Sequence, residues 1–577
     1  MKLCLILLFP LLQTAFFSSP LAAAEAGRYG GQLVLPASSD PRSFNPILAK
    51  ETSTTAITGI IFEGLTRTNG LTTEVEPALA KSWSVDESGL VWEFDLRRDV
   101  FWSDGERFTA DDVVWTFNRL IYNPAIPSSA RDIFTLSGER IKVEKADDHR
   151  VRFILPRRFA PFLRAMSQEI LPRHILAPIV AAGRFNFAWG TDTPPGDIVG
   201  TGPFFLKEYI PGERVVLQRN PLYYRRDKQG QRLPYLEKVV FVVTGGREGA
   251  LLRFLDGQVD YYALGGRDYP LLKPREARGN FTIYNTGPAL GSNFLVFNQN
   301  SGVNPQTGRP YLDKKKLRWF SDYEFRRAIA RAIDKKAMVE ILMNGFGRGQ
   351  HSALSPSCGF FYNPNVRVYG YDLARAGDIL SRAGYVDRDG DGLREDGEGN
   401  TLEFTLYTNS QSSERAQIAA IIKNDLARLG IKVNLLNLEF NDLVRRLTAT
   451  YEWEAMVIGL TGGIEPHFGK NVWYSAGSLH MWYPRQQAPV TDWEREIDGI
   501  FDAAAGEMNA KRRKALYDRW QEIVAERLPV IYTVLSDAMF AVRNKFGNLK
   551  PTSFGGAFHN LEEIYIERKR ARALERQ

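Results

Sequence analysis

The chain has 577 residues, of which 44% are hydrophobic, 24% charged and 12% aromatic. This balance is typical of a globular protein and excludes a collagen-like, coiled-coil or wholly disordered chain. The formal net charge of +7 is spread along the sequence, with basic and acidic residues interleaved, and this argues against nucleic acid as a partner.

Residues 1–24 have the pattern of a cleavable secretory signal. Lys2 gives a positive start, an apolar stretch follows it, and Ala22–Ala24 offers a cleavage site. Cys4 precedes the apolar stretch, so it does not stand where a lipoprotein cysteine would. No later segment reaches the length of about 18 apolar residues that a membrane helix needs. We therefore expect an exported, soluble protein of the periplasm.

The apolar pattern of the remaining chain predicts a mixed α/β structure. Strands are expected at 31–36, 92–96, 204–206, 214–218, 287–298 and 531–534, and helices at 55–65, 109–120, 325–341, 371–383 and 511–527. Thr109 and Asp112 stand in the positions of a capping box. The clearest unit is 401–436, a strand–helix–strand pattern in which Gly430 ends the helix. Such a unit implies two parallel strands.

The acidic loop that follows the predicted helix at 371–383 matches the spacing of a calcium-binding loop. The candidate ligands are the carboxylates of Asp387, Asp389, Asp391 and Glu398 and the backbone carbonyl of Leu393. Alternating carboxylates can converge on one hard cation, whose role here would be structural. A strand, not a helix, is predicted after the loop, so a solvated acidic turn stays the alternative. The sequence calls for no other cofactor.

The chain carries none of the common enzyme motifs. A nucleophile elbow, a zinc-protease helix, a phosphate-binding lysine loop and a glycine-rich dinucleotide loop are all missing from the sequence. Without an evident nucleophile and base, we expect that the protein is not an enzyme. A secreted hydrolase with its site around His467 is the alternative from another functional class.

Several ordered motifs resemble those of a known family. They are Ala80–Trp83, Gly89–Arg97, Trp102–Gly105, Thr109–Arg119, Gly200–Pro203, Asn220–Tyr224, Phe325–Asp334, Tyr371–Tyr385 and Leu426–Ile431. In this order the chain resembles the family 5 extracellular solute-binding proteins, which are the peptide-, dipeptide- and nickel-binding subunits of ABC importers. The resemblance extends from about residue 30 to about residue 565, nearly the whole mature chain.

The resemblance implies an α/β fold of two lobes around a hinge, with an extra domain inserted in the first lobe. The expected division is a signal peptide at 1–24, lobe 1 at 25–70 and 201–285, the inserted domain at 71–200, lobe 2 at 286–529, and at 530–577 a return to lobe 1 with a basic C-terminal tail. Such a protein closes on its ligand by hinge motion. We expect a monomer that delivers its solute to a membrane permease; a ligand sensor for a membrane receptor is the alternative role.

The resemblance also suggests which residues line the cleft between the lobes. The candidates are Asn45, Ser292, Asn293, Glu465, His467, Trp473 and Tyr474, and ordinary packing is the alternative for each. In oligopeptide-binding relatives, an aspartate shortly before a Glu-Pro pair captures the free amine of the peptide. Here Gly462 and Gly463 stand where that aspartate is expected, ahead of Glu465. Either Glu465 replaces the aspartate or the ligand is not a free-amine peptide.

Peptides are the first ligand class that the resemblance suggests, since extended peptides can be held through their backbone. An oligosaccharide is the alternative, because Trp473, Tyr474 and Trp482 offer aromatic faces for sugar rings. Nickel fits less well, since the sequence shows no tight cluster of metal ligands.

Overall fold

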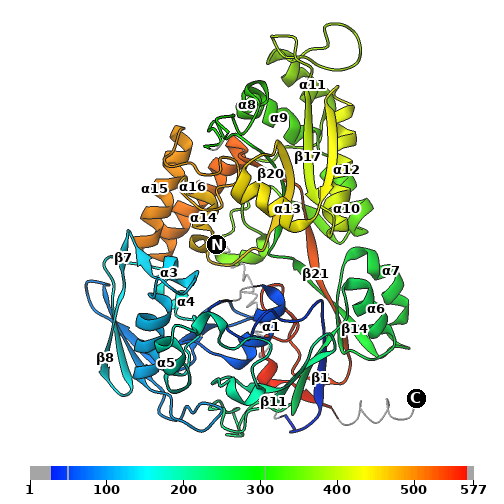
Figure 1. The fold of residues 1–577 in the computed structure, drawn as a ribbon. Coiled ribbons are helices and arrows are strands. Elements are labelled where there is room, and N and C mark those ends of the chain that lie inside the picture. The colour runs from blue at the N-terminus through cyan, green and yellow to red at the C-terminus, as the bar shows by residue number, and fades with distance from the viewer. Residues whose placement is uncertain (1–26, 49–50, 306, 568–577) are drawn as a thin grey trace, which may run out of the picture.

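The structure is a computed structural model that describes residues 27–48, 51–305 and 307–567. The predicted signal peptide and the basic tail at 568–577 lie outside the described residues. Among the residues described, no helix combines the length and the apolar character needed to cross a membrane. Two lobes lie one above the other in Figure 1, with the strand β21 (Val534–Arg543) running between them.

Lobe 1, the lower lobe in Figure 1, is built around a four-stranded sheet. Its strands, in sheet order, are β1 (Gln32–Ala37), β12 (Lys238–Val243), β11 (Arg214–Arg219) and β10 (Phe204–Ile210). β1 pairs parallel to β12, and the other neighbours are antiparallel. Helix α1 (Thr52–Ile61) lies against β10 and buries Ile57 and Ile61. The predicted helix at 55–65 therefore exists, shifted toward the N-terminus.

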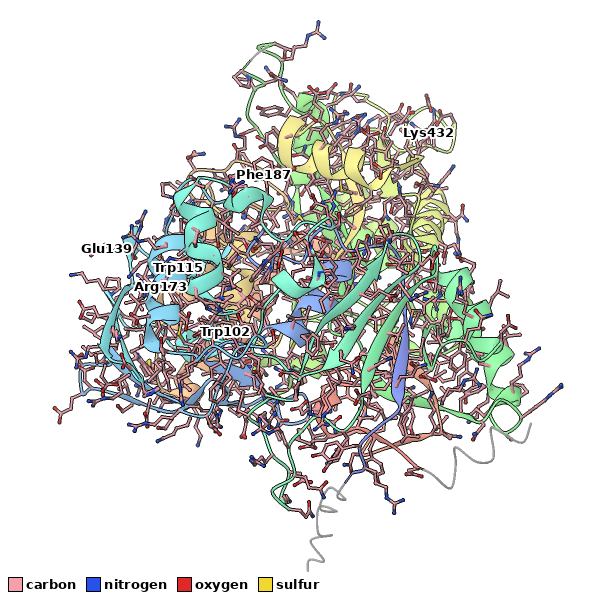
Figure 2. All side chains as sticks on the ribbon, turned by 60° about the horizontal axis from the view of Figure 1, so that its bottom comes forward. Trp102, Trp115, Glu139, Arg173, Phe187 and Lys432 are labelled. Carbon is pink, nitrogen blue, oxygen red and sulfur yellow. The ribbon has the colours of Figure 1, made fainter. Side chains whose placement is uncertain are left out.

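A second four-stranded sheet is formed by the residues between β1 and β10. Its strands, in sheet order, are β4 (Ala80–Val85), β5 (Val91–Leu96), β9 (Arg150–Ile154) and β8 (Lys142–Asp147), all antiparallel. β5 alternates between buried and half-buried residues, as its sequence predicts. Helix α2 (Ala110–Trp115) begins at the capping box of Thr109 and Asp112, which is confirmed, and α5 (Arg173–Ala181) lies beside it (Figure 2).

Two chain segments cross between the lobes side by side. β14 (Phe281–Pro288) leads into β15 (Ser292–Phe297), and β20 (Val530–Tyr532) leads into β21. β14 and β13 (Tyr261–Leu264) flank β21, whereas β15 and β20 pair in the sheet of lobe 2. The backbone amides of Ala289 and Thr533 donate to the carbonyls of Ser536 (2.8 Å) and Asn293 (3.0 Å) across the two crossings. The lobes are thus joined by two short segments that are hydrogen-bonded to each other.

The single strand predicted at 287–298 is two strands in the structure. The first of them ends at Pro288, directly after Gly287, whose positive φ of 85° is a conformation that glycine adopts without strain. The chain then crosses to lobe 2 before β15 begins at Ser292. Because β20 pairs in the lobe 2 sheet, that sheet extends past the predicted boundary at 529/530. The other domain boundaries stay predictions.

Lobe 2 is built around a five-stranded sheet with helices on both faces. Its strands, in sheet order, are β18 (Lys432–Leu438), β17 (Glu403–Asn409), β19 (Ala455–Leu460), β15 and β20. β17 and β18 are parallel and are joined by α12 (Ser413–Ala427), which confirms the strand–helix–strand prediction. Alternate residues of β15 point to two apolar clusters: Leu295 packs with residues of α12, and Val296 packs with residues of α15 (Asp492–Gly506) and α16 (Ala510–Arg527).

The helix predicted at 325–341 is two helices, α9 (Tyr323–Ala332) and α10 (Lys335–Met343). The side chain of Asp334 accepts a hydrogen bond from the Ala337 amide (2.9 Å), so it caps a new helix where the pattern suggests continuation. The remaining helices and strands are α3 (Ala130–Ile133), α4 (Phe162–Ala165), α6 (Arg247–Leu255), α7 (Tyr269–Leu272), α8 (Lys314–Ser321), α11 (Leu373–Arg382), α13 (Phe440–Arg445), α14 (Lys470–Trp473), β2 (Thr66–Thr68), β3 (Val75–Pro77), β6 (Thr135–Leu136), β7 (Glu139–Arg140), β16 (Gly347–Gly349), β22 (Phe546–Gly547) and β23 (Tyr565–Ile566).

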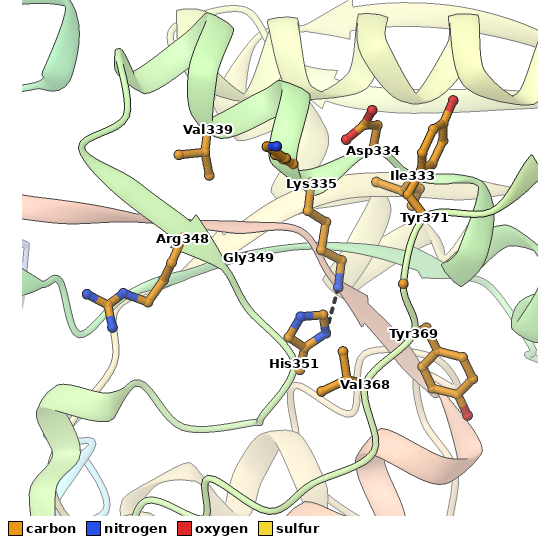
Figure 3. Close-up of a pocket in the computed structure, with 12 residues that line it drawn as sticks. Ile333, Asp334, Lys335, Val339, Arg348, Gly349, His351, Val368, Tyr369 and Tyr371 are labelled. Atoms are coloured by element: carbon orange, nitrogen blue, oxygen red, sulfur yellow. Dashed lines mark hydrogen bonds between the residues drawn. The ribbon is translucent and has the colours of Figure 1, made fainter.

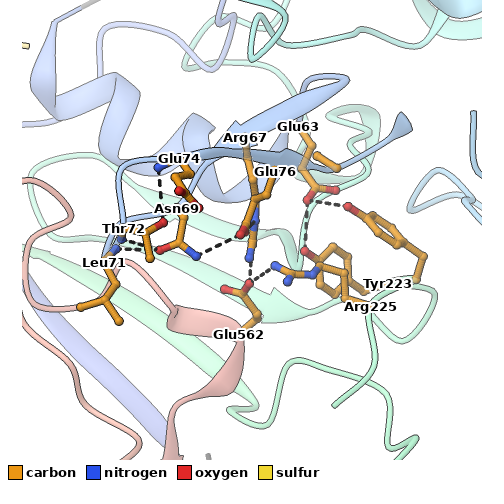
Figure 4. A network of polar contacts seen from close by, with 12 residues as sticks. Glu63, Arg67, Asn69, Leu71, Thr72, Glu74, Glu76, Tyr223, Arg225 and Glu562 are labelled. Carbon is orange, nitrogen blue, oxygen red and sulfur yellow. Dashed lines mark hydrogen bonds and ion pairs between the residues drawn. The ribbon is translucent and has the colours of Figure 1, made fainter. Parts of the chain in front are cut away.

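A buried polar network ties the C-terminal segment to lobe 1 (Figure 4). Arg67 and Arg225 both form ion pairs with Glu562. Beside them, the Glu63 carboxylate accepts hydrogen bonds from the hydroxyls of Tyr223 (3.0 Å) and Tyr224 (3.3 Å). Burial raises the pKa of Glu63 to about 8, so this carboxyl group is largely protonated at neutral pH.

We expect Glu63 to make the stability of the protein fall as the pH rises. Between its ordinary pKa of 4.5 and the folded value of about 8, the folded protein holds a proton that the unfolded chain releases. Each unit of that difference is worth about 1.4 kcal/mol. Glu63→Gln, measured by urea unfolding from about pH 5 to about pH 8, should lose less stability over this range than the wild type. Glu74→Gln, at an exposed position nearby, is the control, and equal slopes for the two variants would contradict the assignment.

Candidate solute-binding site

A cavity of about 350 Å³ lies in lobe 2, where the chain crosses from lobe 1. Its walls come from Leu290 and Ser292 at the crossing, from the loop 353–358, and from the segment that follows β19. Trp520 of α16 and Tyr532 of β20 complete the lining. Segments far apart in the sequence therefore meet here, at the base of the strands that connect the lobes.

Three of the seven predicted ligand residues line this cavity: Ser292, Glu465 and Trp473. The other four lie elsewhere. Asn293 donates to Glu414 (2.8 Å) and accepts from Arg415 (3.0 Å). His467 packs against Phe159, and Tyr474 donates to Asp502 (3.0 Å). Asn45 is fully buried in lobe 1, where its amide donates to the Ala188 carbonyl (3.3 Å). The side-chain amide of Asn45 thus forms hydrogen bonds within lobe 1, to the Ala188 carbonyl and from the Ile47 amide.

The carboxylate of Glu465 is not free to capture an amine. Arg513 of α16 binds both of its oxygens, one at 3.1 Å, and the two side chains are 8% and 3% exposed. The Arg513 guanidinium also donates to the Ala504 carbonyl (3.1 Å) and lies over the rings of Phe361 and Tyr517. Glu465 is the one carboxylate among the described lining residues. The cavity therefore offers a ligand no unpaired negative charge.

The two glycines ahead of Glu465 have different roles in the cavity. A Cβ atom at Gly462 would lie 1.8 Å from the carbonyl oxygen of Leu290, so only glycine allows this close approach of the segment to the crossing. A Cβ atom at Gly463 would meet nothing within 4 Å, and the Gly463 carbonyl accepts the thiol of Cys358 at 3.2 Å. At Gly463, the missing side chain leaves space in the cavity.

The backbone beyond β19 has unused hydrogen-bonding capacity. β19 ends at Leu460, which pairs with Ser292. Among the described residues, the amides of 461–464 find no backbone acceptor. Three of these four residues line the cavity. Unpaired amides beside a cavity are donors that a bound ligand can use.

Residues 74–478 match the model of the bacterial extracellular solute-binding proteins, family 5. The chain belongs to this family. The resemblance inferred from the ordered motifs is thereby confirmed.

Two curated relatives of this solute-binding protein cover most of its length. A probable ABC transporter-binding protein of Deinococcus radiodurans is 26% identical over 528 residues, which cover 87% of this chain and 86% of the relative. The oligopeptide-binding protein AppA of Bacillus subtilis is 26% identical over 527 residues, which cover 90% of this chain and 88% of AppA. Relatives of this kind are substrate-binding proteins of transport systems.

Solved structures confirm the predicted two-lobed α/β fold of the family. AppA of Bacillus subtilis in complex with a nonapeptide has a TM-score of 0.74 at 24% identity and covers 94% of this chain and 100% of that one. MelB of Agrobacterium fabrum in complex with stachyose has a TM-score of 0.76 at 22% identity and covers 95% of this chain and 86% of that one. This solute-binding protein thus shares its fold with proteins solved with quite different ligands.

Residues that precede α4 contact lobe 2 beside the cavity of this solute-binding protein. The amide of Ala160 donates to the Ala505 carbonyl (2.7 Å), and the ring of Phe159 meets that of His467 edge-on, with 5.2 Å between ring centres. Burial and the nearby cations lower the pKa of His467 to about 3, so the imidazole is uncharged at neutral pH. A histidine with this pKa is a poor general base, and the hydrolase alternative gains no support from it.

Sequence reasoning missed the parts of the cavity that come from other segments. Cys358, Trp520 and Tyr532 line it, yet they lie more than 45 residues from the Glu-Pro pair. Trp520 packs edge-on against Trp473, with 5.2 Å between ring centres. No local pattern marks these residues, because in sequence each one looks like an ordinary core position.

The acidic loop at 387–398 brings four carboxylates together, with one change from the prediction. Oxygens of Asp387, Asp389, Asp391 and Glu395 all lie within 4.8 Å of one another. Glu398 is not among them: it forms an ion pair with Arg318 at 2.5 Å. Two local features separate Glu398 from the cluster. A β-bridge between Val386 and Glu395 folds the loop back before residue 398. A turn then follows at Asp396, whose carboxylate accepts from the Glu398 amide (2.9 Å). Leu393 donates its amide to Asp391 (2.7 Å).

Proposed function

We propose that this protein is the periplasmic substrate-binding subunit of an ABC importer. It captures a peptide in the cavity at the crossing, closes by hinge motion and delivers the peptide to a membrane permease. The observation that carries the peptide assignment is the row of unpaired amides at 461–464, which continue β19 beside the cavity. An extended peptide can add to such an edge through its carbonyl groups, with little dependence on side chains.

The family membership and the crossings support the transport role. A ligand shifts a binding protein toward its closed state only to the extent that the closed state binds the ligand more tightly than the open state does. Here two short crossings and the contact of Phe159 with His467 supply a hinge and a surface that meets lobe 2. We expect the protein to act as a monomer without catalysis.

A neutral oligosaccharide is the second candidate ligand. The pairing of Glu465 with Arg513 leaves the cavity without a free charge for an amine, and Trp473 and Phe468 contribute aromatic surface to its lining. Aromatic faces beside neutral polar groups suit sugar rings.

Native mass spectrometry of protein purified from periplasm without denaturant separates the two candidates. A mixture of adducts at peptide masses is expected. A ladder of hexose masses would instead assign the cavity to oligosaccharides. Loss of the adducts on mild denaturation would show that they are bound noncovalently.

Cys358 provides an independent reporter of occupancy, because it lines the cavity and is the only cysteine after residue 24. Burial raises the pKa of its thiol to about 11, so labelling by a maleimide should be slow. A ligand in the cavity should slow it further. Labelling that is equally fast with and without the co-purified ligand would contradict the placement of the ligand in this cavity.

We also propose that the acidic loop binds one calcium ion in a structural role. Asp387, Asp389, Asp391 and Glu395 supply the oxygens, and the ion offsets the repulsion between their charges. Calcium at 100 times its Kd should raise the free energy of unfolding by about 2.7 kcal/mol. Asp389→Asn should weaken this effect in calcium-dependent thermal melts, whereas Asp192→Asn, at an exposed position in the other lobe, should leave it unchanged. A melting temperature that is the same with and without calcium would contradict the calcium proposal.

A further inference from the structure

Lobe 2 contains a second cavity, of about 340 Å³, which shares no lining residue with the solute cavity. It lies between the first turn of α10, the end of β16 and the segment 368–371 (Figure 3). Val339, Val368 and Tyr369 give it apolar walls, and cationic side chains reach it from α10 and β16. Nothing in the solute-binding role accounts for this cavity.

The most unusual group in this second cavity is Lys335. Its side chain is half-buried and its ammonium end is enclosed by protein. The Nζ atom donates to the Gln350 carbonyl (2.8 Å). It also lies 3.3 Å from Nδ1 of His351, the contact that is drawn as a dashed line in Figure 3. A lysine so enclosed is normally paired with a carboxylate. Among the described residues, none forms an ion pair with Lys335.

The neighbouring groups do not supply the missing negative charge. Asp334 lines the cavity, but its carboxylate accepts from the Ala337 amide (2.9 Å) and is not among the ion pairs that the described residues form with a lysine. Burial, together with the nearby lysine, lowers the pKa of His351 to about 4, so the imidazole is neutral and adds no countercharge. The other titratable groups that line the cavity are cations or phenols: Lys336 on α10, Arg348 on β16, and Tyr369 and Tyr371 on the segment that closes it. Arg367 and Tyr532 face Lys335 from a small neighbouring cavity, and they too are a cation and a phenol.

We propose that this second cavity binds an organic anion, whose carboxylate meets the ammonium group of Lys335 while its apolar part lies on Val339 and Val368. The anion supplies the negative countercharge that Lys335 lacks among the described residues, and a cavity of this size accepts a small molecule. A carboxylate that accepts from an enclosed ammonium forms a charge-assisted hydrogen bond, among the stronger polar contacts in proteins.

The proposal also predicts how binding depends on pH. Burial lowers the pKa of Lys335 to about 7 in the empty protein. An anion favours the charged form of the lysine, so binding takes up a proton near neutral pH. Affinity should therefore fall as the pH rises from about 6 to about 8. His351 is already neutral throughout this range and does not add to the effect.

Benzoate is a suitable probe, with benzamide as its neutral counterpart and inorganic phosphate as a second anion. In calorimetric titrations of the whole protein at about pH 6, we expect benzoate to bind, and benzamide to bind at least about tenfold more weakly, a difference of about 1.4 kcal/mol. Equal binding of benzamide, or no heat from benzoate at millimolar concentration, would overturn the proposal. Phosphate binding tighter than that of benzoate would assign the lysine to phosphate and overturn the carboxylate assignment.

Two variants locate the probe and guard against misfolding. Lys335→Met should weaken benzoate at least about tenfold and remove the pH dependence, whereas Lys423→Met, at an exposed position of α12 outside this cavity, should stay within about twofold of the wild type. Val368→Trp keeps the lysine and fills the apolar part of the cavity from an exposed position, so it should weaken benzoate without lowering the melting temperature. Unchanged benzoate binding in both Lys335→Met and Val368→Trp would place the probe elsewhere. The co-purified solute should persist in all three variants.

Discussion

Arg513→Met is expected to lower the free energy of unfolding by about 3–5 kcal/mol, because it leaves the Glu465 carboxylate buried without a countercharge, with the His467 amide (3.1 Å) still donating to it. In the wild type, the Arg513 guanidinium binds both oxygens of Glu465 and also donates to the Ala504 carbonyl. The two charges are almost fully shielded from water, so neither can be hydrated when the other is removed. Urea unfolding at neutral pH measures the loss.

The preceding residue of α16 gives a matched control for this experiment. Arg512 is also paired with a glutamate, Glu507, but its side chain is 72% exposed. Arg512→Met should change the stability by less than about 1 kcal/mol, as exposed ion pairs do. The double variant Glu465→Gln with Arg513→Met removes the stranded charge and should recover part of the loss. Equal effects of Arg512→Met and Arg513→Met would show that the buried pair is not formed.

Gly462→Ala is expected to reduce solute binding at least about tenfold, a loss of about 1.4 kcal/mol or more. The added methyl carbon would fall 1.8 Å from the carbonyl oxygen of Leu290 and 2.5 Å from its carbon. Both are backbone atoms of the crossing, which cannot turn aside as a side chain can. The segment that carries the unpaired amides must then move away from the crossing, and the cavity changes shape.

The fraction of protein that carries a co-purified ligand in native mass spectrometry measures this effect. Gly499→Ala, inside α15 where a Cβ atom meets nothing within 4 Å, is the control for a glycine substitution in lobe 2 and should retain the ligand. A Gly462→Ala protein with unchanged occupancy would show that the ligand does not depend on this segment. A fall in occupancy in the Gly499→Ala control would point to a general loss of stability.

The cavity presents no free charge to a ligand among its described lining residues. Gly462 and Gly463 stand where the family resemblance led us to expect an amine-binding aspartate, and the Glu465 carboxylate is paired with Arg513. Under the proposed function, binding therefore rests on backbone donors and aromatic surface, neither of which distinguishes strongly between charged ligand ends. The cavity is therefore suited to ligands whose contact groups are neutral.

Much of the fold could be predicted from local sequence signals. The alternation in β5, the capping box at Thr109 and the apolar face of α12 each lie within a few residues, so they are visible without the tertiary structure. The order of the family motifs along the chain identified the two-lobed architecture. The division of the helix at Asp334 was missed because the apolar spacing continues across the cap.

The site depended on partners that are distant in the sequence. Glu465 looked like a free anchor until the fold placed Arg513, 48 residues later, on both of its oxygens. Glu398 fitted the spacing of a calcium ligand until Arg318, 80 residues earlier, proved to be its partner, with Glu395 in its place.

The sequence by itself therefore determined the family, the α/β class and the residue types available to the site. Only the tertiary structure decided which of these groups are charged, paired or open to a ligand. The physical reason is that periodicity and capping act between neighbours in the chain, whereas the charge state of Glu63 or Lys335 is set by burial, and the partner of Glu465 is a group that folding brings beside it.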